Sequence, residues 1–175
     1  MFLETDRLYL RKINQDDFEE LKSMLQDPDV MYAWEYTFSD EDVQSWIDKN
    51  IDCYRQYNLG YFFAVDKQSN EIVGQAALMP DIIDNRLHYE VGYILKKQYW
   101  HCGYARECVK SLVRYAFSEL DLKEVIFEIR PGNAASRKVA EFFDAQIKGQ
   151  FIKNVRGKKM LHLIYVLNKE ALRWI

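Results

Sequence analysis

The sequence predicts an α/β fold in which a mixed, mostly antiparallel seven-stranded sheet carries helices on both of its faces. Short runs rich in Tyr, Phe, Val and Ile alternate along the chain with stretches whose apolar residues recur at helical spacing. No repeat, low-complexity tract or Pro/Gly-rich linker interrupts the 175 residues. Because this length suits one core of ordinary size, we expect a single domain over residues 1–175.

The first third of the chain is expected to form one strand and two helices. Residues 8–13 alternate as the two faces of a strand do. Asp16 and Asp17 open a short helix. Ser39 is placed to cap a second helix, because a serine just before an apolar helical stripe is a common N-cap. That stripe consists of Val43, Trp46, Ile47, Ile51 and Tyr54.

The rest of the chain is expected to add six strands and two helices. The strands are short, rich in aromatic and β-branched residues, and bounded by turn residues. In order, the segments are strands at 61–66, 72–80 and 86–95, a helix at 103–119, a strand at 124–130, a helix at 134–144, and two strands flanking the turn at 154–157. This order places helices on both sides of one sheet.

Charge and cysteine content exclude several classes of protein. The formal net charge is −3, which argues against a general nucleic-acid binder, since such a protein needs a basic face. Cys53, Cys102 and Cys108 show no CxxC spacing and indicate a reduced, intracellular protein. The first residues contain no apolar signal region, and no apolar run approaches the roughly 18 residues of a membrane span. We expect a cytoplasmic protein with no membrane partner.

The segment most informative about function is YILKKQYWHCGYA, residues 93–105. A strand ends there, a short loop follows, and a helix begins near Gly103. The unpaired backbone N–H groups of a helix start form an anion site of diphosphate size, and a glycine lets the backbone approach a ligand closely. A strand that turns into a helix around a glycine also occurs in many α/β proteins without any ligand there.

Four blocks, in order, resemble the GNAT acetyltransferase superfamily, and most closely its ribosomal-protein N-terminal acetyltransferase (RimJ/RimL-type) branch. The first is LETDRLYLRK at the N-terminus, and the second is the strand HYEVGYIL. The third, WHCGYA at 100–105, is similar to the cofactor loop WGKGYA, and the fourth is RPGNAASRKVAEFF. They cover nearly the whole chain, so the resemblance implies the GNAT fold.

The chain departs from the family pattern at three places. His101 replaces the usual first glycine of the loop, and because histidine tolerates positive φ poorly, we expect weaker cofactor binding. Asp144 and Ala145 stand where the last helix usually closes with Gly-Phe. Ala140 stands where many members carry a tyrosine general acid, which leaves the identity of the acid open.

The resemblance implies that acetyl-CoA is the co-substrate and that a primary amine, either a protein N-terminus or a small molecule, attacks its thioester directly. The strand before the loop would pair with the pantetheine arm, and the loop would hold the diphosphate. The residues expected at the cofactor are Ile94, Leu95, Trp100, His101, Cys102, Gly103, Tyr104, Ala105, Arg106, Asn133 and Lys138.

Glu90 is the candidate general base. An alkyl ammonium with a pKa of roughly 10 is unreactive until it is deprotonated. Along the strand, Glu90 shares one face with Ile94, while Val91 and Tyr93 share the other, which we interpret as the core face. Glu90 therefore points toward a surface or a cleft. The alternative is a solvated carboxylate with no role in catalysis.

Ser136 is the candidate acid on the side of the departing thiolate, and its alternative is a first-turn serine that supports a helix cap. Asn133 is placed to cap this helix or to bind the pantetheine amide, and the two roles are compatible. Arg106, Arg137 and Lys138 either meet cofactor phosphates or are solvated surface charges. The aromatic residues Tyr32, Trp34, Tyr36 and Phe38 are either core or a wall of the acceptor site.

Other functions remain as alternatives. The three histidines lack metal-binding spacing, so no metal is predicted. A covalent route through Cys102 has no His–carboxylate dyad to support it. A catalytically silent acyl-CoA-binding module is the main alternative. A P-loop or dinucleotide-binding protein is a third, and the lack of either glycine motif argues against it. The expected assembly is a monomer or a homodimer.

Overall fold

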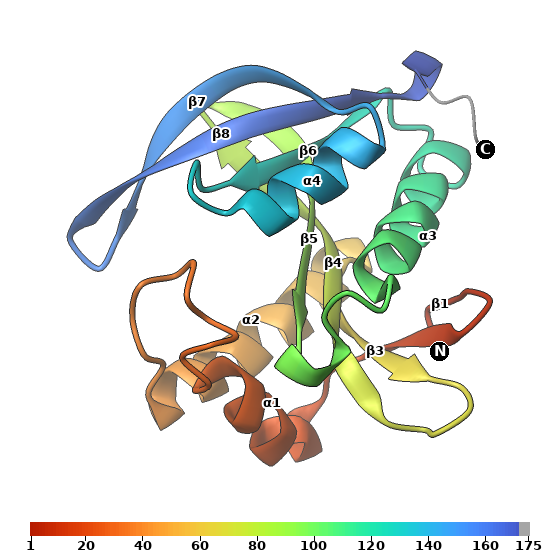
Figure 1. Ribbon diagram of the computed structural model, residues 1–175, viewed down its shortest axis with the longest axis vertical. Coiled ribbons are helices and arrows are strands. Elements are labelled where there is room, and N and C mark those ends of the chain that lie inside the picture. Colours follow the sequence, from red (N-terminus) through yellow and green to blue (C-terminus); the bar gives the residue numbers. More distant parts are fainter. Residues whose placement is uncertain (172–175) are drawn as a thin grey trace.

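The computed structural model describes residues 1–171, which form one eight-stranded sheet (Figure 1). The strand order is β1-β2-β3-β4-β5-β6-β8-β7, and every neighbouring pair is antiparallel except β5 with β6. The strands are β1 (Leu3–Glu4), β2 (Leu8–Lys12), β3 (Gly60–Asp66), β4 (Ile72–Ile83), β5 (Arg86–Leu95), β6 (Glu124–Ile129), β7 (Gln146–Val155) and β8 (Lys158–Asn168). The predicted fold class is confirmed. The additional strand, β1, has two residues, too few for alternation to reveal it.

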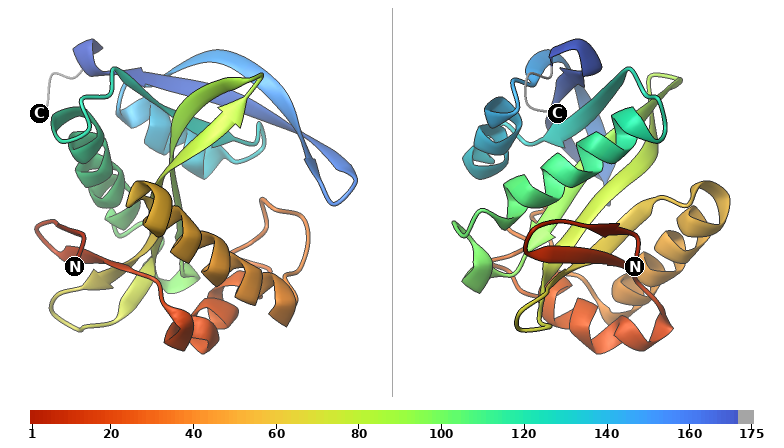
Figure 2. Two further views of the ribbon diagram at one scale, coloured as in Figure 1. Left: turned by 180° about the vertical axis from the view of Figure 1, so that it is seen from behind. Right: turned by 90° about the vertical axis from the view of Figure 1, so that its right-hand side faces the viewer.

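The helices lie on both faces of the sheet (Figure 2). Helices α1 (Phe18–Leu25) and α2 (Asp40–Tyr57) cover one face, and α3 (Tyr104–Ser118) and α4 (Ala134–Phe142) cover the other. Short 3-10 turns occur at Gln15–Asp17, Lys97–Tyr99 and Lys169–Ala171. Within the described residues, no helix combines the length and the apolar character that crossing a membrane requires.

Each face of the sheet buries its own apolar core, because both faces are covered by amphipathic helices. On the α3 side, Leu112 and Val113 pack with Val91 and Phe127 of the sheet. On the α1–α2 side, Leu21 and Ile47 belong to the cluster that also contains Ile94, Phe63 and Tyr61. The face of β5 that carries Glu90 is therefore also a core face, whereas the sequence pattern identified only the face of Val91 and Tyr93 as core.

Local signals account for most element boundaries. Ser39 caps α2 as predicted, since its Oγ accepts from the backbone N–H of Asp42 and Asp42 accepts from the N–H of Ser39. The predicted strand 72–80 was too short, because β4 continues past Pro80 to Ile83. Strand β3 ends its pairing at Leu78, so Pro80 lies where β4 has only β5 as a neighbour, and a residue without an N–H is tolerated there.

Candidate active site

The loop at residues 100–105 turns β5 into α3 through two left-handed residues. His101 has φ +62° and Gly103 has φ +84°, and Gly103 is the N-cap of α3. Glu107 makes the first N–H bond of the helix, to the Gly103 carbonyl, so the preceding N–H groups have no acceptor within the helix. A glycine cap adds no side-chain acceptor. The loop therefore presents free backbone donors and a positive helix end, as predicted for an anion site.

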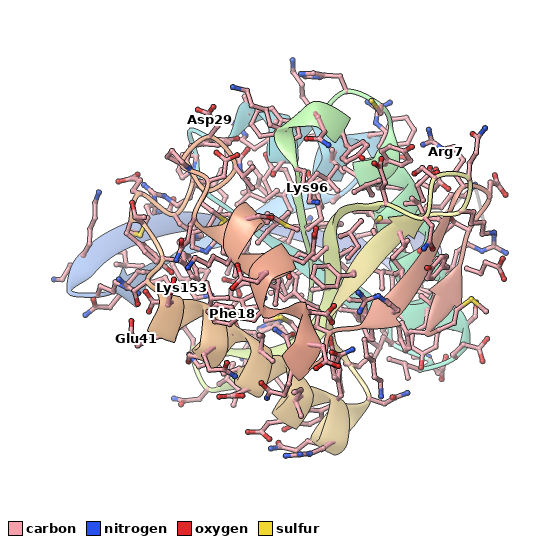
Figure 3. The ribbon with its side chains drawn as sticks, turned by 90° about the horizontal axis from the view of Figure 1, so that it is seen from below. Arg7, Phe18, Asp29, Glu41, Lys96 and Lys153 are labelled. Atoms are coloured by element: carbon pink, nitrogen blue, oxygen red, sulfur yellow. The ribbon has the colours of Figure 1, made fainter. Side chains whose placement is uncertain are left out.

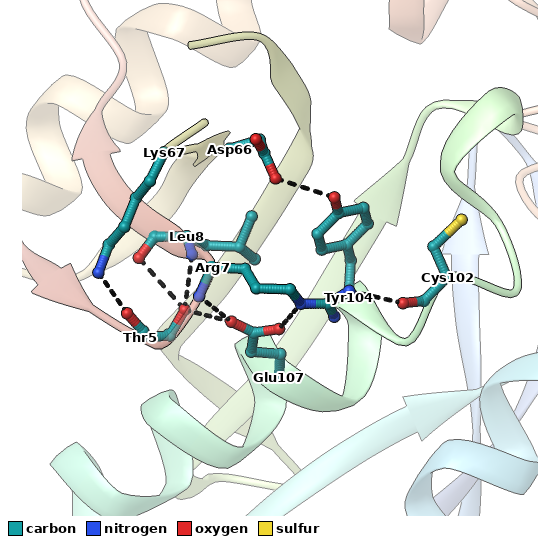
Figure 4. A network of polar contacts seen from close by, with 8 residues as sticks. All are labelled: Thr5, Arg7, Leu8, Asp66, Lys67, Cys102, Tyr104 and Glu107. Atoms are coloured by element: carbon teal, nitrogen blue, oxygen red, sulfur yellow. Dashed lines mark hydrogen bonds and ion pairs between the residues drawn. The ribbon is translucent and has the colours of Figure 1, made fainter. Parts of the chain in front are cut away.

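A polar network ties this loop to the N-terminal strands (Figure 4). The Arg7 guanidinium bonds Glu107 of α3 at 2.7 Å and donates from Nη1 to the Cys102 carbonyl at 3.0 Å. Tyr104 donates from its hydroxyl to Asp66 at 2.9 Å, and Arg7 stacks over the Tyr104 ring. These contacts hold the loop in shape from elements that are distant in the sequence.

The two strands at the centre of the sheet separate next to a cavity. Strands β5 and β6 are bridged in parallel at Glu90 and Ile126, and they diverge from there (Figure 1). A cavity of about 500 Å³ opens beside the divergence, and its walls include Gly92 and Tyr93 of β5 and Ile129 of β6. Parallel strands that part in this way leave backbone groups unpaired, so an extended ligand can bond to them.

Glu90 lies at this divergence and lines the cavity, in agreement with the prediction that it faces a cleft. Its carboxylate is grouped with those of Asp81 on β4 and Glu128 on β6, with ligand oxygens within 4.8 Å of one another. Lys153 of β7 contacts Glu128 at 2.8 Å and Asp81 at 3.5 Å. Figure 3 shows Lys153 on the side of the molecule covered by α1 and α2. We call these four residues the carboxylate cluster.

Burial sets the protonation of the carboxylate cluster. It raises the pKa of Glu90 to about 7, with the positive charge of Lys153 working against this and the charge of Asp81 adding to it. Burial also raises the pKa of Glu128 to about 8, with further contributions from Glu90 and Asp81. A carboxyl that titrates near neutral pH can accept a proton at physiological pH and release it afterwards, as a general base must.

The start of α4 faces the same cavity from the other side. The Asn133 side chain caps the helix by accepting from the Ser136 N–H at 3.1 Å, and it also accepts from the Tyr32 hydroxyl at 2.8 Å. Ser136 accepts at Oγ from the Tyr93 hydroxyl at 3.3 Å. Asn133, Ser136 and Tyr93 all line the cavity. The cap predicted for Asn133 is confirmed.

The segment before α2 supplies an aromatic wall. Trp34 and Tyr36 line the cavity together with Trp46, whereas Phe38 is buried in the core beside α1 and α2. Arg130 bonds Glu35 at 2.6 Å, and Lys158 also pairs with Glu35, so the segment is held against β6 and β8. The predicted aromatic group is therefore divided between the two roles that the sequence left open, except for Tyr32, which is exposed and takes neither role.

The remaining predicted site residues lie outside the cavity. Ile94 and Leu95 are buried, and the Leu95 carbonyl accepts from the indole N–H of Trp100 at 2.9 Å. Arg106 and Lys138 are exposed on α3 and α4. Arg106 lies over the ring of Phe142, with its guanidinium carbon 4.0 Å from the ring centre. The structure thus brings together Glu90, Asn133 and Ser136, while the residues of the 100–105 loop form a separate group.

Sequence reasoning missed several residues of the cavity and of the carboxylate cluster. Asp81 was placed after the end of its strand, and Glu128 and Lys153 carried no local motif. Tyr93 was assigned to the core, although its ring reaches the cavity as well as the α3-side core. One signal was available for Glu128, since the strand 124–130 is otherwise apolar at its centre and a lone carboxylate in it needs a partner.

Comparison with known proteins identifies the family to which this fold belongs. Residues 7–146 match the family model described as acetyltransferase (GNAT) domain. The chain therefore belongs to the GNAT family of N-acetyltransferases.

Individual relatives support this family over most of the chain. The uncharacterized protein YkkB of Bacillus subtilis is 33% identical over 140 residues, covering 79% of this chain and 81% of that protein. A GNAT-family acetyltransferase from Bacillus anthracis superposes with a TM-score of 0.79 at 26% identity, covering 97% of this chain and 99% of that one. A ribosomal-protein-S5-alanine acetyltransferase from Vibrio fischeri superposes with a TM-score of 0.75 at 20% identity, over 96% of each chain, and shares the fold.

Proposed function

We propose that this enzyme transfers the acetyl group of acetyl-CoA to a primary amine by direct attack of the amine on the thioester. The observation that carries the proposal is the position of Glu90, a half-buried carboxyl with a pKa of about 7 that lines the cavity at the point where β5 and β6 diverge. A base of this kind deprotonates an alkyl ammonium within reach of a thioester lodged between the strands.

The cofactor is proposed to enter along the gap between the strands. Its diphosphate binds the free N–H groups of the 100–105 loop, from Trp100 to Ala105, at the start of α3. Arg106 and Lys138 are near enough to helix starts to attract its phosphates. Its pantetheine arm bonds the backbone near Ile94 and Leu95, and that backbone donates to the thioester oxygen as charge develops there.

The groups on α4 are proposed to act on the thiol side of the reaction. Asn133 presents an amide beside the gap and binds the pantetheine while it caps the helix. Ser136 is the hydroxyl donor to the departing sulfur, because it lines the cavity. Ala140, at the place of the family's tyrosine acid, is buried and has no hydroxyl. Glu90 and Ser136 are thus the proposed catalytic pair.

The acceptor is proposed to be a compact primary amine. A volume of about 500 Å³ is typical of a small-molecule site, and the aromatic walls with a carboxylate at one end suit an ammonium on an apolar body. The four sequence blocks favour the RimJ/RimL-type branch, which keeps a protein N-terminus as the competing acceptor. We further propose a cytoplasmic protein that acts as a monomer or homodimer.

A second candidate function is a catalytically silent acyl-CoA-binding module. The observation that favours it is Ala140, which is fully buried at the place of the family's usual tyrosine acid. An enzyme and a silent module bind acetyl-CoA alike, but only the enzyme releases free CoA in the presence of an amine.

Two measurements test the proposal together. Acetyl-CoA at about 100 times its Kd should stabilise the fold by roughly 2.7 kcal/mol, which a thermal shift detects. A panel of small amines and N-terminal peptides, assayed for CoA thiol release, then separates the two functions and the two acceptor classes. No thermal shift at millimolar acetyl-CoA would refute cofactor binding, and a shift without thiol release on any acceptor would favour the silent module.

A further inference from the structure

Two hydroxyls from different elements meet at the edge of the cavity. The Tyr93 hydroxyl of β5 donates to Ser136 Oγ of α4 at 3.3 Å, across 43 residues of sequence. Both side chains are partly buried, and both line the cavity. The bond joins β5 to α4 next to the divergence of β5 and β6, so it lies beside the path proposed for the cofactor.

Tyr93 and Glu90 act on opposite faces of the sheet. Successive side chains of a strand alternate, and Tyr93 packs with the α3-side core whereas Ile94 packs with the α1–α2 core. Glu90, four residues before Ile94, shares the α1–α2 face. A thioester lodged between the strands would therefore meet its amine from the side of Glu90 and release its sulfur toward the side of Tyr93 and Ser136.

We propose that Tyr93 is a positioning residue for the thiol side of the reaction: it donates its hydroxyl proton to Ser136, which in turn donates to the departing sulfur. This inference rests on the proposed function. A serine hydroxyl alone is a poor proton donor, because giving up its proton leaves an alkoxide. A phenol hydrogen-bonded to the serine can replace the proton that the serine gives up, because a phenol is a stronger acid than an aliphatic alcohol.

The step balances without any added reagent. The amine nitrogen bonds the thioester carbon, and its proton goes to Glu90. The C–S bond breaks, and its electron pair stays on sulfur. Sulfur takes the Ser136 proton, Ser136 takes the Tyr93 proton, and water later returns a proton to Tyr93 and accepts the one held by Glu90. Burial raises the pKa of Tyr93 to about 12, so the hydroxyl is protonated at the start of every cycle.

The decisive variant is Tyr93→Phe, which keeps the ring and removes only the hydroxyl. Tyr89→Phe is the matched control, because Tyr89 lies four residues earlier on the same face, packs on the same core, and does not line this cavity. We expect Tyr93→Phe to lower kcat about five- to tenfold, the effect of one hydrogen bond, with acetyl-CoA affinity unchanged. Tyr89→Phe should keep the wild-type kcat.

A double-mutant cycle and a spectroscopic titration separate a donor chain from a merely structural role. If Tyr93 acts through Ser136, adding Tyr93→Phe to Ser136→Ala should change kcat no further. The ultraviolet absorbance of the thiolate of bound CoA should show a lower thiol pKa in the wild type than in Tyr93→Phe. Saturating CoA favours the folded form, so this titration also serves if the variant is destabilised.

The outcomes are distinguishable from failure of the proposed function. If the wild type binds no acetyl-CoA or acetylates no amine, the proposed function itself fails. If the wild type is active and Tyr93→Phe has the same kcat and the same bound-thiol pKa, only the role of Tyr93 is overturned. If the kcat losses of Tyr93→Phe and Ser136→Ala multiply in the double variant, the proton relay from Tyr93 through Ser136 is also overturned.

Discussion

The 100–105 loop and the carboxylate cluster are built in opposite ways. The loop is one continuous segment, and its proposed ligand contacts are backbone N–H groups at the start of α3. The carboxylate cluster takes one side chain from each of the strands β4, β5, β6 and β7, so residues 81 and 153 meet only because the sheet forms. The first region depends on backbone conformation, and the second depends on charge and burial.

This difference teaches where each region is vulnerable. A backbone site is insensitive to most side-chain changes but fails when a residue cannot adopt its φ, as at Gly103 with φ +84°. A partly buried charge cluster tolerates backbone variation, but it is destabilised when one charge is removed, because the remaining charges are then left without a compensating partner. Substitutions in the two regions should therefore affect different measured quantities.

The largest expected effect comes from the carboxylate cluster. Glu90→Gln keeps the shape of the side chain and removes its basicity, so kcat should fall by roughly 10²–10⁴ if Glu90 is the base. The loss should shrink at high pH, where more of the amine is already uncharged. Steady-state rates from pH 6 to pH 9.5 measure both effects.

The control for Glu90 is Glu124→Gln, which removes an exposed carboxylate from the start of β6. It should leave kcat unchanged, and neither variant should alter acetyl-CoA affinity. A Glu90→Gln enzyme with the wild-type rate at pH 7 would remove Glu90 from the role of base and return it to binding or structure.

The next largest effect is expected at the loop. Gly103→Val places a β-branched residue at φ +84°, so the helix start must change shape and its N–H groups move. We expect at least a tenfold loss of acetyl-CoA affinity by calorimetry. The added Cβ would lie 3.5 Å from Arg7, so crowding is minor and the backbone is the cause.

Gly157→Val is the matched control for Gly103. Gly157 has φ +81° in the β7–β8 turn and no atom within 4 Å of an added Cβ, so it imposes the same backbone strain away from the loop. Both variants should lower the melting temperature, and only Gly103→Val should lower affinity. Equal affinities for the two variants would show that the loop has no part in binding.

The same contrast explains what the sequence could predict. The loop and the α4 cap are local signals, so the helix start at Gly103 and the Asn133 cap were predictable from adjacent residues. The face of Glu90 followed from strand alternation. The carboxylate cluster was not predictable from the sequence. Asp81 belongs to it only because β4 continues past Pro80, and Lys153 belongs to it only because β7 pairs with the side of β8 that faces away from β6. Long-range register is not encoded in any short segment.

A smaller effect tests the electrostatics of the cluster. The charge of Lys153 lowers the pKa of Glu90, so Lys153→Met should raise that pKa above its present value of about 7. A base acts only when it is ionised, so the acidic limb of the kcat/KM profile should move to higher pH. Because Lys153 is partly exposed, we expect a shift of up to about one pH unit.

Lys159→Met removes the same charge from an exposed position on β8 and serves as the control. Its profile should match the wild type. If both variants move the limb equally, the cause is the overall charge of the protein. If Lys153→Met leaves the limb in place, the ionisation that governs the rate is not that of Glu90.

The smallest effect is expected at His101, and it tests whether the loop is formed before the cofactor arrives. His101 has φ +62°, and if the loop keeps this shape before and after the cofactor binds, the strain of a non-glycine residue there is the same in both states. Histidine in place of the family's glycine should then lower the stability of the fold and leave acetyl-CoA affinity unchanged. The sequence alone predicted weaker binding.

In His101→Gly, relief of strain is offset by the greater freedom of glycine in the unfolded chain, so the melting temperature should change little. Acetyl-CoA affinity should change by less than about twofold. Calorimetry on His101→Gly beside His101→Ala, which retains the strain, decides the matter: a marked gain of affinity for glycine alone would mean that the loop reaches its binding shape only with the cofactor.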